Sequence, residues 1–251
     1  MSFWFWHGLW NGIRSTRYPG IVESALGVTP GRPVATEFAS PEQASLAAAD
    51  CPVNAIVAQG SSAQVDLRTC VHCQRCRFGG AYPLEWKQDY EWTMVAASRE
   101  NYVPLPDSYR RSLHIMVVDA GDCGACLREV KHLNNPFYNA HRLGIFFTAT
   151  PRFADLLLVV GPVSENMRVP LLKTYEAMPT PKRVVAVGAC AITGGVFGSG
   201  FMSAGGVSSV LPVDLEIPGD PPPPLAILHG LLAVTGRKAL APRKPDFGRT
   251  A

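Results

Sequence analysis

Residues 69–80, "TCVHCQRCRFGG", place three cysteines at a spacing of three residues, at Cys70, Cys73 and Cys76. Thiols with this spacing wrap one corner of an iron–sulfur cubane, which constrains the stretch to fold as a loop around a metal centre. The full pattern, C-x2-C-x2-C-x3-C-P, would put a fourth cysteine at position 80, where the chain has Gly80. The fourth ligand must therefore come from another part of the chain.

Cys51, in the segment "DCPVNAI", is the predicted fourth ligand. In two-cluster ferredoxins, the cysteine that precedes a proline binds the other cluster, not the one that its own cysteine triplet builds. Residues 31–50 hold no cysteine, so the half-site of Cys51 has no triplet of its own. Two half-sites together then supply four thiolates for one [4Fe–4S] cluster, from Cys51, Cys70, Cys73 and Cys76.

The alternatives at this site are a zinc ion or a few buried cysteines without metal. Zinc sites usually combine one C-x2-C pair with a second, distant pair, and a triplet differs from that pattern. His72 and Arg75 lie inside the loop. We expect them to donate hydrogen bonds near the cluster sulfurs, which tunes a reduction potential, and not to bind metal.

The composition sets the broad class of protein. With 251 residues, 47% hydrophobic and 17% charged, the chain is typical of a globular protein of one large or about two domains. A net charge of +3 gives no reason to expect a nucleic-acid partner. The longest apolar runs fall far short of the roughly 20 residues of a membrane-spanning helix, and no secretory signal is visible. We expect a cytoplasmic protein with no transmembrane segment of its own, whose closely spaced cysteines bind metal.

The first residues are unusually aromatic, with Trp4, Trp6 and Trp10 next to Phe3 and Phe5. Such a segment either packs on its own domain or on a partner, or it rests at a membrane interface, where tryptophan is enriched.

The amino-acid composition of the chain changes near residue 105. Residues 1–87 are rich in cysteine, residues 88–111 read as a connector, and residues 239–251 form a polar, proline-bearing tail that we expect to be loosely held. Residues 112–238 alternate apolar runs with amphipathic stretches, which predicts a doubly wound α/β sheet. The predicted strands are 113–120, 143–150, 155–161, 183–189 and 210–219, and the predicted helices are 127–135, 167–178 and 222–237.

A second site is predicted at the ends of these strands. Cys123 and Cys126 follow the first strand, Cys190 follows the fourth, and Asp220 follows the fifth. In open α/β sheets, sites form in the crevice beyond the carboxyl ends of the strands, so these four side chains are expected to converge. The alternatives are a redox-active dithiol made by Cys123 and Cys126, and a merely buried Cys190.

Five motifs occur in a distinctive order along residues 112–236: "CGACLREV", "NPFYNAHRLGI", "PRFADLLLVVGPVSENM", "LLKTYEAMPTPKRVVAVGACAITGGVF" and "VLPVDLEIPGDPPPP". Together they resemble the small subunit shared by complex I, where it is the 20 kDa subunit, and the [NiFe] hydrogenases. Within that family the similarity is to energy-converting hydrogenases of the formate hydrogenlyase type. The resemblance implies a flavodoxin-like fold.

The same resemblance implies a [4Fe–4S] cluster bound by a C-x-x-C, a cysteine in "GxCA" and a cysteine in "PGCPP". The first three ligands correspond to Cys123, Cys126 and Cys190, and Glu129 matches an acidic residue of the hydrogenase branch. The last motif reads "PGDPP" here, so Asp220 stands in the place of the fourth cysteine. Three outcomes are open: Asp220 ligates the fourth iron, the cluster is a 3Fe–4S form, or no second cluster assembles.

The N-terminal part, with "STRYPG" and the first four cysteines, resembles the separate ferredoxin-like subunit of those complexes. The chain is then interpreted as a fusion of a small ferredoxin-like α+β domain with the α/β domain.

The resemblance implies an iron–sulfur electron-transfer subunit without catalytic residues of its own. Its expected partners are a hydrogenase large subunit or a complex I 49 kDa-like subunit, together with membrane subunits, and no nucleic acid. Its expected location is peripheral, on the cytoplasmic face of the cell membrane. The rival hypotheses are a scaffold subunit whose second cluster is lost or is a 3Fe form, and a free-standing dithiol oxidoreductase.

Overall fold

The computed structural model describes residues 3–12, 14–25, 27–99 and 101–241. Most of the predicted tail, residues 239–251, lies outside the described residues.

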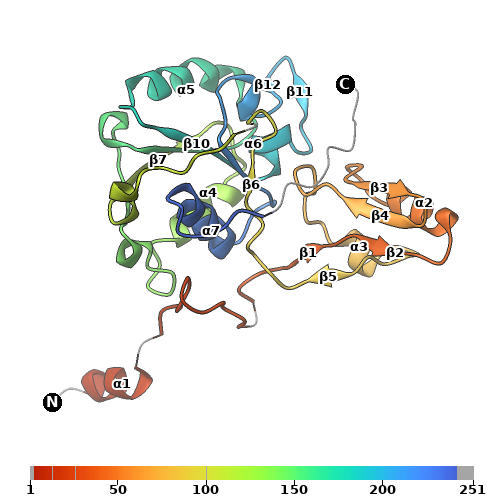
Figure 1. Ribbon diagram of the computed structural model, residues 1–251, viewed down its shortest axis with the longest axis horizontal. Helices are drawn as coiled ribbons and strands as arrows, with labels where there is room; N and C mark the ends of the chain where they lie inside the picture. The colour runs from red at the N-terminus through yellow and green to blue at the C-terminus, as the bar shows by residue number, and fades with distance from the viewer. Residues whose placement is uncertain (1–2, 13, 26, 100, 242–251) are drawn as a thin grey trace.

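A six-stranded sheet forms the centre of the larger part of the chain (Figure 1). Five strands are parallel, and the sixth, β6, runs antiparallel at one edge. Numbered along the chain, the parallel strands lie in the order 2-1-3-4-5, which is the flavodoxin-like arrangement. The predicted doubly wound sheet is therefore confirmed. In spatial order the strands are β6 (Met94–Val95), β13 (Leu215–Ile217), β10 (Arg183–Val187), β9 (Leu156–Val160), β7 (Leu113–Asp119) and β8 (Ile145–Phe147).

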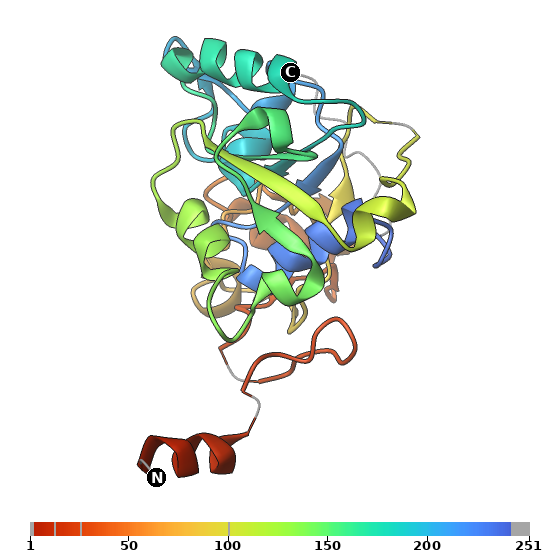
Figure 2. The ribbon, with the colours of Figure 1, turned by 90° about the vertical axis from the view of Figure 1, so that its left-hand side faces the viewer.

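Helices cover both faces of the sheet, so the central strands are apolar along their whole length. Leu156 and Leu158 of β9 face one core, whereas Leu157 and Val159 face the other, because side chains alternate along a strand. α4 and α7 contribute to the first core, and α5 and α6 to the second; Figures 1 and 2 show α5 and α7 on opposite sides of the sheet. The helices are α4 (Ala125–His132), α5 (Glu165–Ala177), α6 (Ala189–Thr193) and α7 (Pro224–Val234).

All eleven residues of α7 are buried. One side of the helix packs on the sheet, and the other meets residues of the N-terminal part, among them Tyr18, Tyr90 and Trp92, in the same core. His229 is 1% exposed, and its ring nitrogens lie 3.0 Å from Thr93 Oγ1 and 3.0 Å from the Ala239 carbonyl. A helix this apolar needs cover on all sides, which the N-terminal part supplies.

After α1, the N-terminal part is built from short strands and the two helices α2 and α3. β2 (Thr36–Glu37), β4 (Ser62–Val65) and β3 (Ile56–Gln59) form an antiparallel sheet, against which α2 (Pro41–Ala49) packs. Ser40 caps α2 by accepting a hydrogen bond from the Gln43 amide, and Pro41 begins the helix. The remaining elements of this part are β1 (Arg32–Pro33), β5 (Trp86–Lys87) and α3 (Arg75–Phe78).

The predicted connector, residues 88–111, also takes part in the large sheet. Its residues Met94–Val95 form β6 and pair with Leu215–Glu216 at the sheet edge. Local sequence does not reveal this strand, because two residues carry no periodic pattern. Short 3-10 turns lie at Asp107–Arg110, Ala140–Leu143, Pro151–Phe153 and Val207–Ser209.

The first helix, α1 (Phe3–Asn11), has no buried residue. In Figures 1 and 2 it lies apart from the rest of the described chain. Trp4, Trp6 and Trp10 are 72%, 61% and 92% exposed, so the aromatic start does not pack on its own domain in this structure. None of the described helices is long and apolar enough to span a bilayer.

Candidate metal centres

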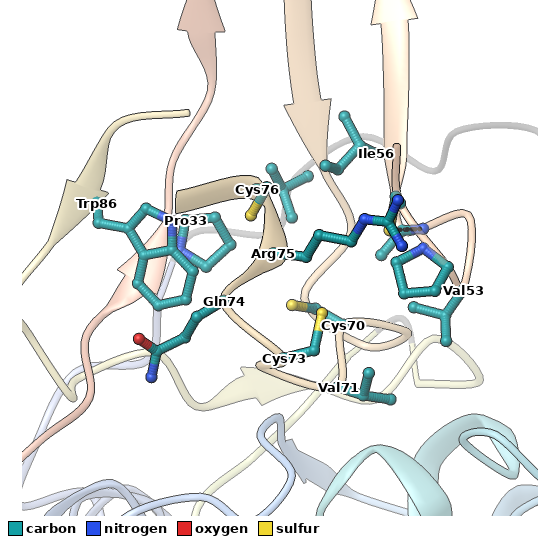
Figure 3. Close-up of a pocket in the computed structure, with 14 residues that line it drawn as sticks. Pro33, Val53, Ile56, Cys70, Val71, Cys73, Gln74, Arg75, Cys76 and Trp86 are labelled. Carbon is teal, nitrogen blue, oxygen red and sulfur yellow. Dashed lines mark hydrogen bonds between the residues drawn. The ribbon is translucent and has the colours of Figure 1, made fainter. Parts of the chain in front are cut away.

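The four cysteines of the first predicted site line one pocket. Cys51 follows α2, Cys70 and Cys73 lie in the loop before α3, and Cys76 lies on α3 itself. In Figure 3 the sulfurs of Cys70, Cys73 and Cys76 face the same space, the first two from the loop before α3 and the third from α3. The structure thus brings together the four thiols that the cysteine spacing predicts.

The loop reaches this arrangement through two residues with left-handed backbone. His72 and Gln74 have φ of 48° and 60°, and they alternate with the cysteines that they separate. Such conformations are uncommon outside glycine and persist where the surroundings hold them. At Cys51, the Ala55 amide donates a hydrogen bond of 3.2 Å to the sulfur. Amide hydrogen bonds of this kind tune the potential of a cluster sulfur.

The thiols of this pocket influence one another's protonation. Burial, opposed by a hydrogen bond from the His72 backbone and aided by Cys76, Cys51 and Cys73, raises the pKa of Cys70 to about 12. Burial also raises the pKa of Cys76. Without a metal, Cys70 and Cys76 are neutral thiols at neutral pH. Because metal ligands must be thiolates, loading of the site releases protons.

Aromatic rings border the pocket. The Trp86 indole lines it, and the Trp86 side chain acts to lower the pKa of Cys76, against the larger effect of burial. The ring of His72 stacks on Trp92, with centroids 5.7 Å apart, and meets Trp86 edge-on at 6.3 Å. Arg75 also lines the pocket. The His72 backbone hydrogen-bonds Cys70 and acts to lower its pKa, whereas the two ring nitrogens of His72 are buried without a hydrogen-bond partner.

The second predicted site also converges, at the carboxyl ends of β7, β10 and β13. Cys126 and Cys190 are 1% and 6% exposed, whereas Cys123 is exposed. Burial, together with the charges of Asp220 and Cys123, raises the pKa of Cys190 to about 11. The pKa of Cys126 is raised by burial and by the same neighbours. Side chains that act on each other in this way lie close together, although they span nearly 100 residues of sequence.

Two glycines leave room for the sulfurs of this site. A Cβ on Gly188 would lie 2.5 Å from Cys126 Sγ, and a Cβ on Gly195 would lie 2.7 Å from Cys190 Sγ. Both glycines have positive φ, of 91° and 55°. Neither glycine is among the site residues that the sequence predicts. A signal is nevertheless present in "VGACAITGG", where glycines stand on both sides of the cysteine.

Two carboxylates complete the second site. Burial raises the pKa of Asp220, and the charge of Asp122 raises it further. Asp122 Oδ2 accepts hydrogen bonds of 3.0 Å from the Gly124 and Leu127 amides at the start of α4, whereas its Oδ1 is buried and unpartnered. Asp122 is a further residue that sequence reasoning did not assign to the site.

These charges bear on the dithiol hypothesis. A reactive C-x-x-C needs a thiol of lowered pKa, stabilised by positive charge or a helix N-terminus. Cys126 has the opposite environment, because burial and the carboxylates Asp122 and Asp220 raise its pKa. Cys126 is therefore not the thiol of lowered pKa that a dithiol oxidoreductase needs.

Within the described ranges, no three His, Cys, Asp or Glu side chains converge closely enough to hold a single metal ion. The donor types do fit iron–sulfur clusters. The first site offers four thiols around one pocket. The second offers three thiols with Asp220 beside them, and glycines leave space next to the sulfurs of Cys126 and Cys190.

Comparisons with known proteins concern the α/β part of the chain. Residues 123–234 match the family model described as "NADH ubiquinone oxidoreductase, 20 Kd subunit". A probable membrane-bound hydrogenase subunit of Pyrococcus furiosus is 39% identical over 122 residues, which are 49% of this chain and 73% of that protein. An NADH-quinone oxidoreductase subunit of Citrifermentans bemidjiense is 43% identical over 124 residues, which are 49% of this chain and 71% of that protein. This chain belongs to the complex I 20 kDa subunit family.

The family also includes subunits of other complexes. Formate hydrogenlyase subunit 7 of Escherichia coli is 39% identical over 127 residues, which are 51% of this chain and 50% of that protein. The resemblance to the small subunits of complex I and of energy-converting hydrogenases is thereby confirmed. The family match begins at Cys123 and includes Cys126, Cys190 and Asp220, so it bears on the second site and not on the first.

Proposed function

We propose that this complex I 20 kDa family member is an iron–sulfur electron-transfer subunit of a membrane-associated oxidoreductase, of the energy-converting hydrogenase or complex I type. Electrons would pass between a cluster in the N-terminal part and a second cluster at the end of the α/β sheet, which serves the large subunit. The observation that carries this proposal is the pair of ligand sets, of which Cys70 and Cys126 belong to one continuous core.

In this proposal, residues 1–87 are a ferredoxin-like domain fused to the family domain of residues 112–238, with residues 88–111 between them. Cys51, Cys70, Cys73 and Cys76 hold a [4Fe–4S] cluster in the first domain, which supplies one-electron redox chemistry. Ile56 and Val65 line the pocket, Cys70 is buried in it, and Cys73 is exposed. Burial and amide hydrogen bonds at the sulfurs are the means by which this chain sets the potential.

At the second site, Cys123, Cys126 and Cys190 hold a cluster whose fourth position is Asp220. A carboxylate is a harder ligand than a thiolate and holds iron less firmly, so this position is the weak point of the site. We favour a 4Fe–4S cluster with Asp220 ligation or a 3Fe–4S form. The partly buried position of Asp220, near enough to raise the pKa of Cys126 and Cys190, supports the first of these.

The large-subunit partner, a hydrogenase large subunit or a 49 kDa-like subunit, would bind next to the second site. The hairpin of β11 (Ser199–Gly200) and β12 (Ser203–Ala204) follows Cys190 and exposes Phe197, Phe201 and Met202, by 63%, 92% and 54%. Exposed apolar side chains grouped in this way mark a protein interface.

α1 supports a peripheral location on the cytoplasmic face of the membrane, next to membrane subunits. Its tryptophans are exposed, Arg14 and Arg17 follow it, and residues 3–22 carry no acidic side chain. Tryptophan and arginine together suit the interface of an anionic membrane.

A scaffold subunit is the second candidate function. Asp220 favours it, because the loss of one thiolate could leave the second site without a cluster and the domain with a docking role only. Iron and sulfide quantitation on anaerobically purified full-length protein separates the two. The relay predicts about seven or eight iron atoms per chain, whereas the scaffold predicts about four. Colourless protein without sulfide would rule out both the electron relay and the scaffold subunit with one cluster.

A further inference from the structure

Trp92 lies between the two candidate metal centres and contacts a segment of each. Its side chain is 1% exposed. On one side its ring stacks on His72, with centroids 5.7 Å apart and planes inclined by 28°. On another side its Nε1–H donates a hydrogen bond of 2.7 Å to the Pro218 carbonyl. A single buried side chain thus connects the N-terminal part to the α/β domain.

The two contacted segments are those that carry the ligands. His72 stands between Cys70 and Cys73, in the loop of the first site, and Pro218 stands two residues before Asp220. His72 also meets the edge of Trp86, which lines the pocket of the first four thiols. A continuous series of packed groups therefore runs from that pocket through Trp86, His72 and Trp92 to the turn that carries Asp220.

Independent contacts hold the same two segments in register. Arg68 Nε lies 2.8 Å from Glu216 Oε2, and Thr193 Oγ1 donates to the Arg68 carbonyl at 3.4 Å. Arg68 precedes the first ligand loop, Glu216 lies on β13, and Thr193 ends the helix of Cys190. Because these links join the same two segments as Trp92, replacement of its ring need not move the two sites relative to each other.

We propose that Trp92 is the bridging residue of the electron path between the two cysteine sites. The inference rests on the proposed function. One centre loses one electron and the other gains it; no bond forms or breaks, and Trp92 is neither oxidised nor reduced. Its ring and its hydrogen bond to Pro218 supply a packed route beside the open cavity that His72, Gln74 and Asp220 line.

The test uses the full chain with its iron–sulfur centres, prepared without air. After flash reduction, the rate at which the electron redistributes between the two centres is measured for the native protein and for Trp92→Leu and Trp92→Phe. Two further readouts accompany the rate: the reduction potential of each centre, and the magnetic coupling between the two reduced centres by electron paramagnetic resonance.

We expect Trp92→Leu to slow the redistribution severalfold, with potentials and magnetic coupling unchanged. Trp92→Phe retains a ring against His72 but loses the bond to Pro218, so its rate should be intermediate. A native rate in Trp92→Leu with both centres present would overturn the proposal. A slower rate with a changed magnetic coupling would also overturn it, because the sites would then have moved.

Two additional variants keep the test decisive. Tyr90→Leu removes another ring that is 1% exposed and packs edge-on against Tyr18, and it should leave the rate unchanged. If Trp92→Leu does not assemble its centres, His72→Asn removes the other half of the stack, since asparagine tolerates the positive φ at this position. An unchanged rate in His72→Asn would overturn the proposal. Failure of the native protein to assemble two centres would instead refute the proposed function.

Discussion

Arg68 and Glu216 form an ion pair of 2.8 Å that joins the loop of the first cysteine site to the strand that leads to Asp220. Their side chains are 15% and 6% exposed. The Glu216 carboxylate also accepts a hydrogen bond from the Ala97 amide at 3.4 Å. The N-terminal part and the α/β domain are thus connected by a buried charge pair between the segment before Cys70 and the strand before Asp220.

The first prediction concerns this pair. Arg68→Met leaves the Glu216 carboxylate buried without its counter-ion and should lower the free energy of unfolding by about 3–5 kcal/mol. Lys173→Met is the control. Its partner Glu176 lies at 2.9 Å, but both side chains are well exposed and solvent screens the pair, so the loss should be much smaller than in Arg68→Met. Urea unfolding of both variants measures the difference.

The loss in Arg68→Met should depend on pH. Burial raises the pKa of Glu216, and Arg68 opposes that rise. Without Arg68 the folded-state pKa rises further above that of the unfolded chain. As pH falls toward about 5, the folded variant binds a proton that the unfolded chain does not. The difference in free energy of unfolding between the variant and the native protein should therefore shrink. A deficit that grows on acidification would contradict this account of the pair.

The second prediction concerns the space that Gly195 leaves next to Cys190 Sγ. In Gly195→Ala the new methyl group would lie 2.7 Å from Cys190 Sγ, so the sulfur must shift and the site should lose iron. Gly198→Ala is a matched control in the same loop: its φ is 63° against 55°, and nothing lies within 4 Å of the new Cβ. Both variants carry about 1–2 kcal/mol of backbone strain, but only the first meets the sulfur. Equal iron content in the two proteins would show that Gly195 does not shape the site.

The third prediction concerns the fourth ligand position. Asp220→Cys restores a thiolate to a set that already contains Cys123, Cys126 and Cys190. Since thiolate is a softer ligand that holds iron more firmly, we expect a more robust four-iron signal in electron paramagnetic resonance. Asp122→Asn, a change beside the site that supplies no thiolate, is the comparison. An Asp220→Cys spectrum identical to the native one would mean that Asp220 does not lie at a cluster.

The fourth prediction is that cluster assembly releases protons. Burial raises the pKa of Cys70 to about 12 and that of Cys190 to about 11, so the metal-free thiols hold their protons at neutral pH. Ligation requires thiolates, and the iron occupancy reached at fixed iron and sulfide should therefore rise between about pH 6 and pH 9. Reconstitution in a weakly buffered solution with a pH indicator measures the release directly. Assembly independent of pH would show that these thiols are already ionised.

The fifth prediction concerns α1. Replacement of Trp4, Trp6 and Trp10 by serine removes exposed aromatic surface that nothing in the described chain covers. Flotation of the full chain with vesicles that contain phosphatidylglycerol should then fall severalfold, because tryptophan favours the membrane interface. The control, Phe153→Ser with Phe201→Ser, removes rings that are 70% and 92% exposed elsewhere. If native and triple-variant proteins float equally, α1 does not bind the lipid surface.

Local signals in the sequence were enough to predict part of this fold. The apolar runs at 155–161 and 183–189 became β9 and β10, and the prolines before Leu225 mark the start of α7. The cysteine spacing selected the four thiols of the first pocket, and the rule for strand ends in α/β sheets assigned Cys190 and Asp220 to the same place as Cys123 and Cys126. The strands were predictable because a hydrophobic period acts over a few residues, and the shared place of Cys123, Cys126, Cys190 and Asp220 was predictable because parallel strands end at one edge of the sheet.

Only the tertiary structure shows which contacts join the two ligand sets. The hydrogen bond from Trp92 to Pro218 spans 126 residues, and the Arg68–Glu216 pair spans 148. Likewise, the space that Gly195 leaves for Cys190 depends on a backbone turn, and the strand Met94–Val95 is recognisable only by its partner β13. Contacts of this range have no periodic signature, because they depend on which surfaces meet after the chain has folded. The sequence therefore specifies the ligands, whereas the packing of one part on the other specifies the path between them.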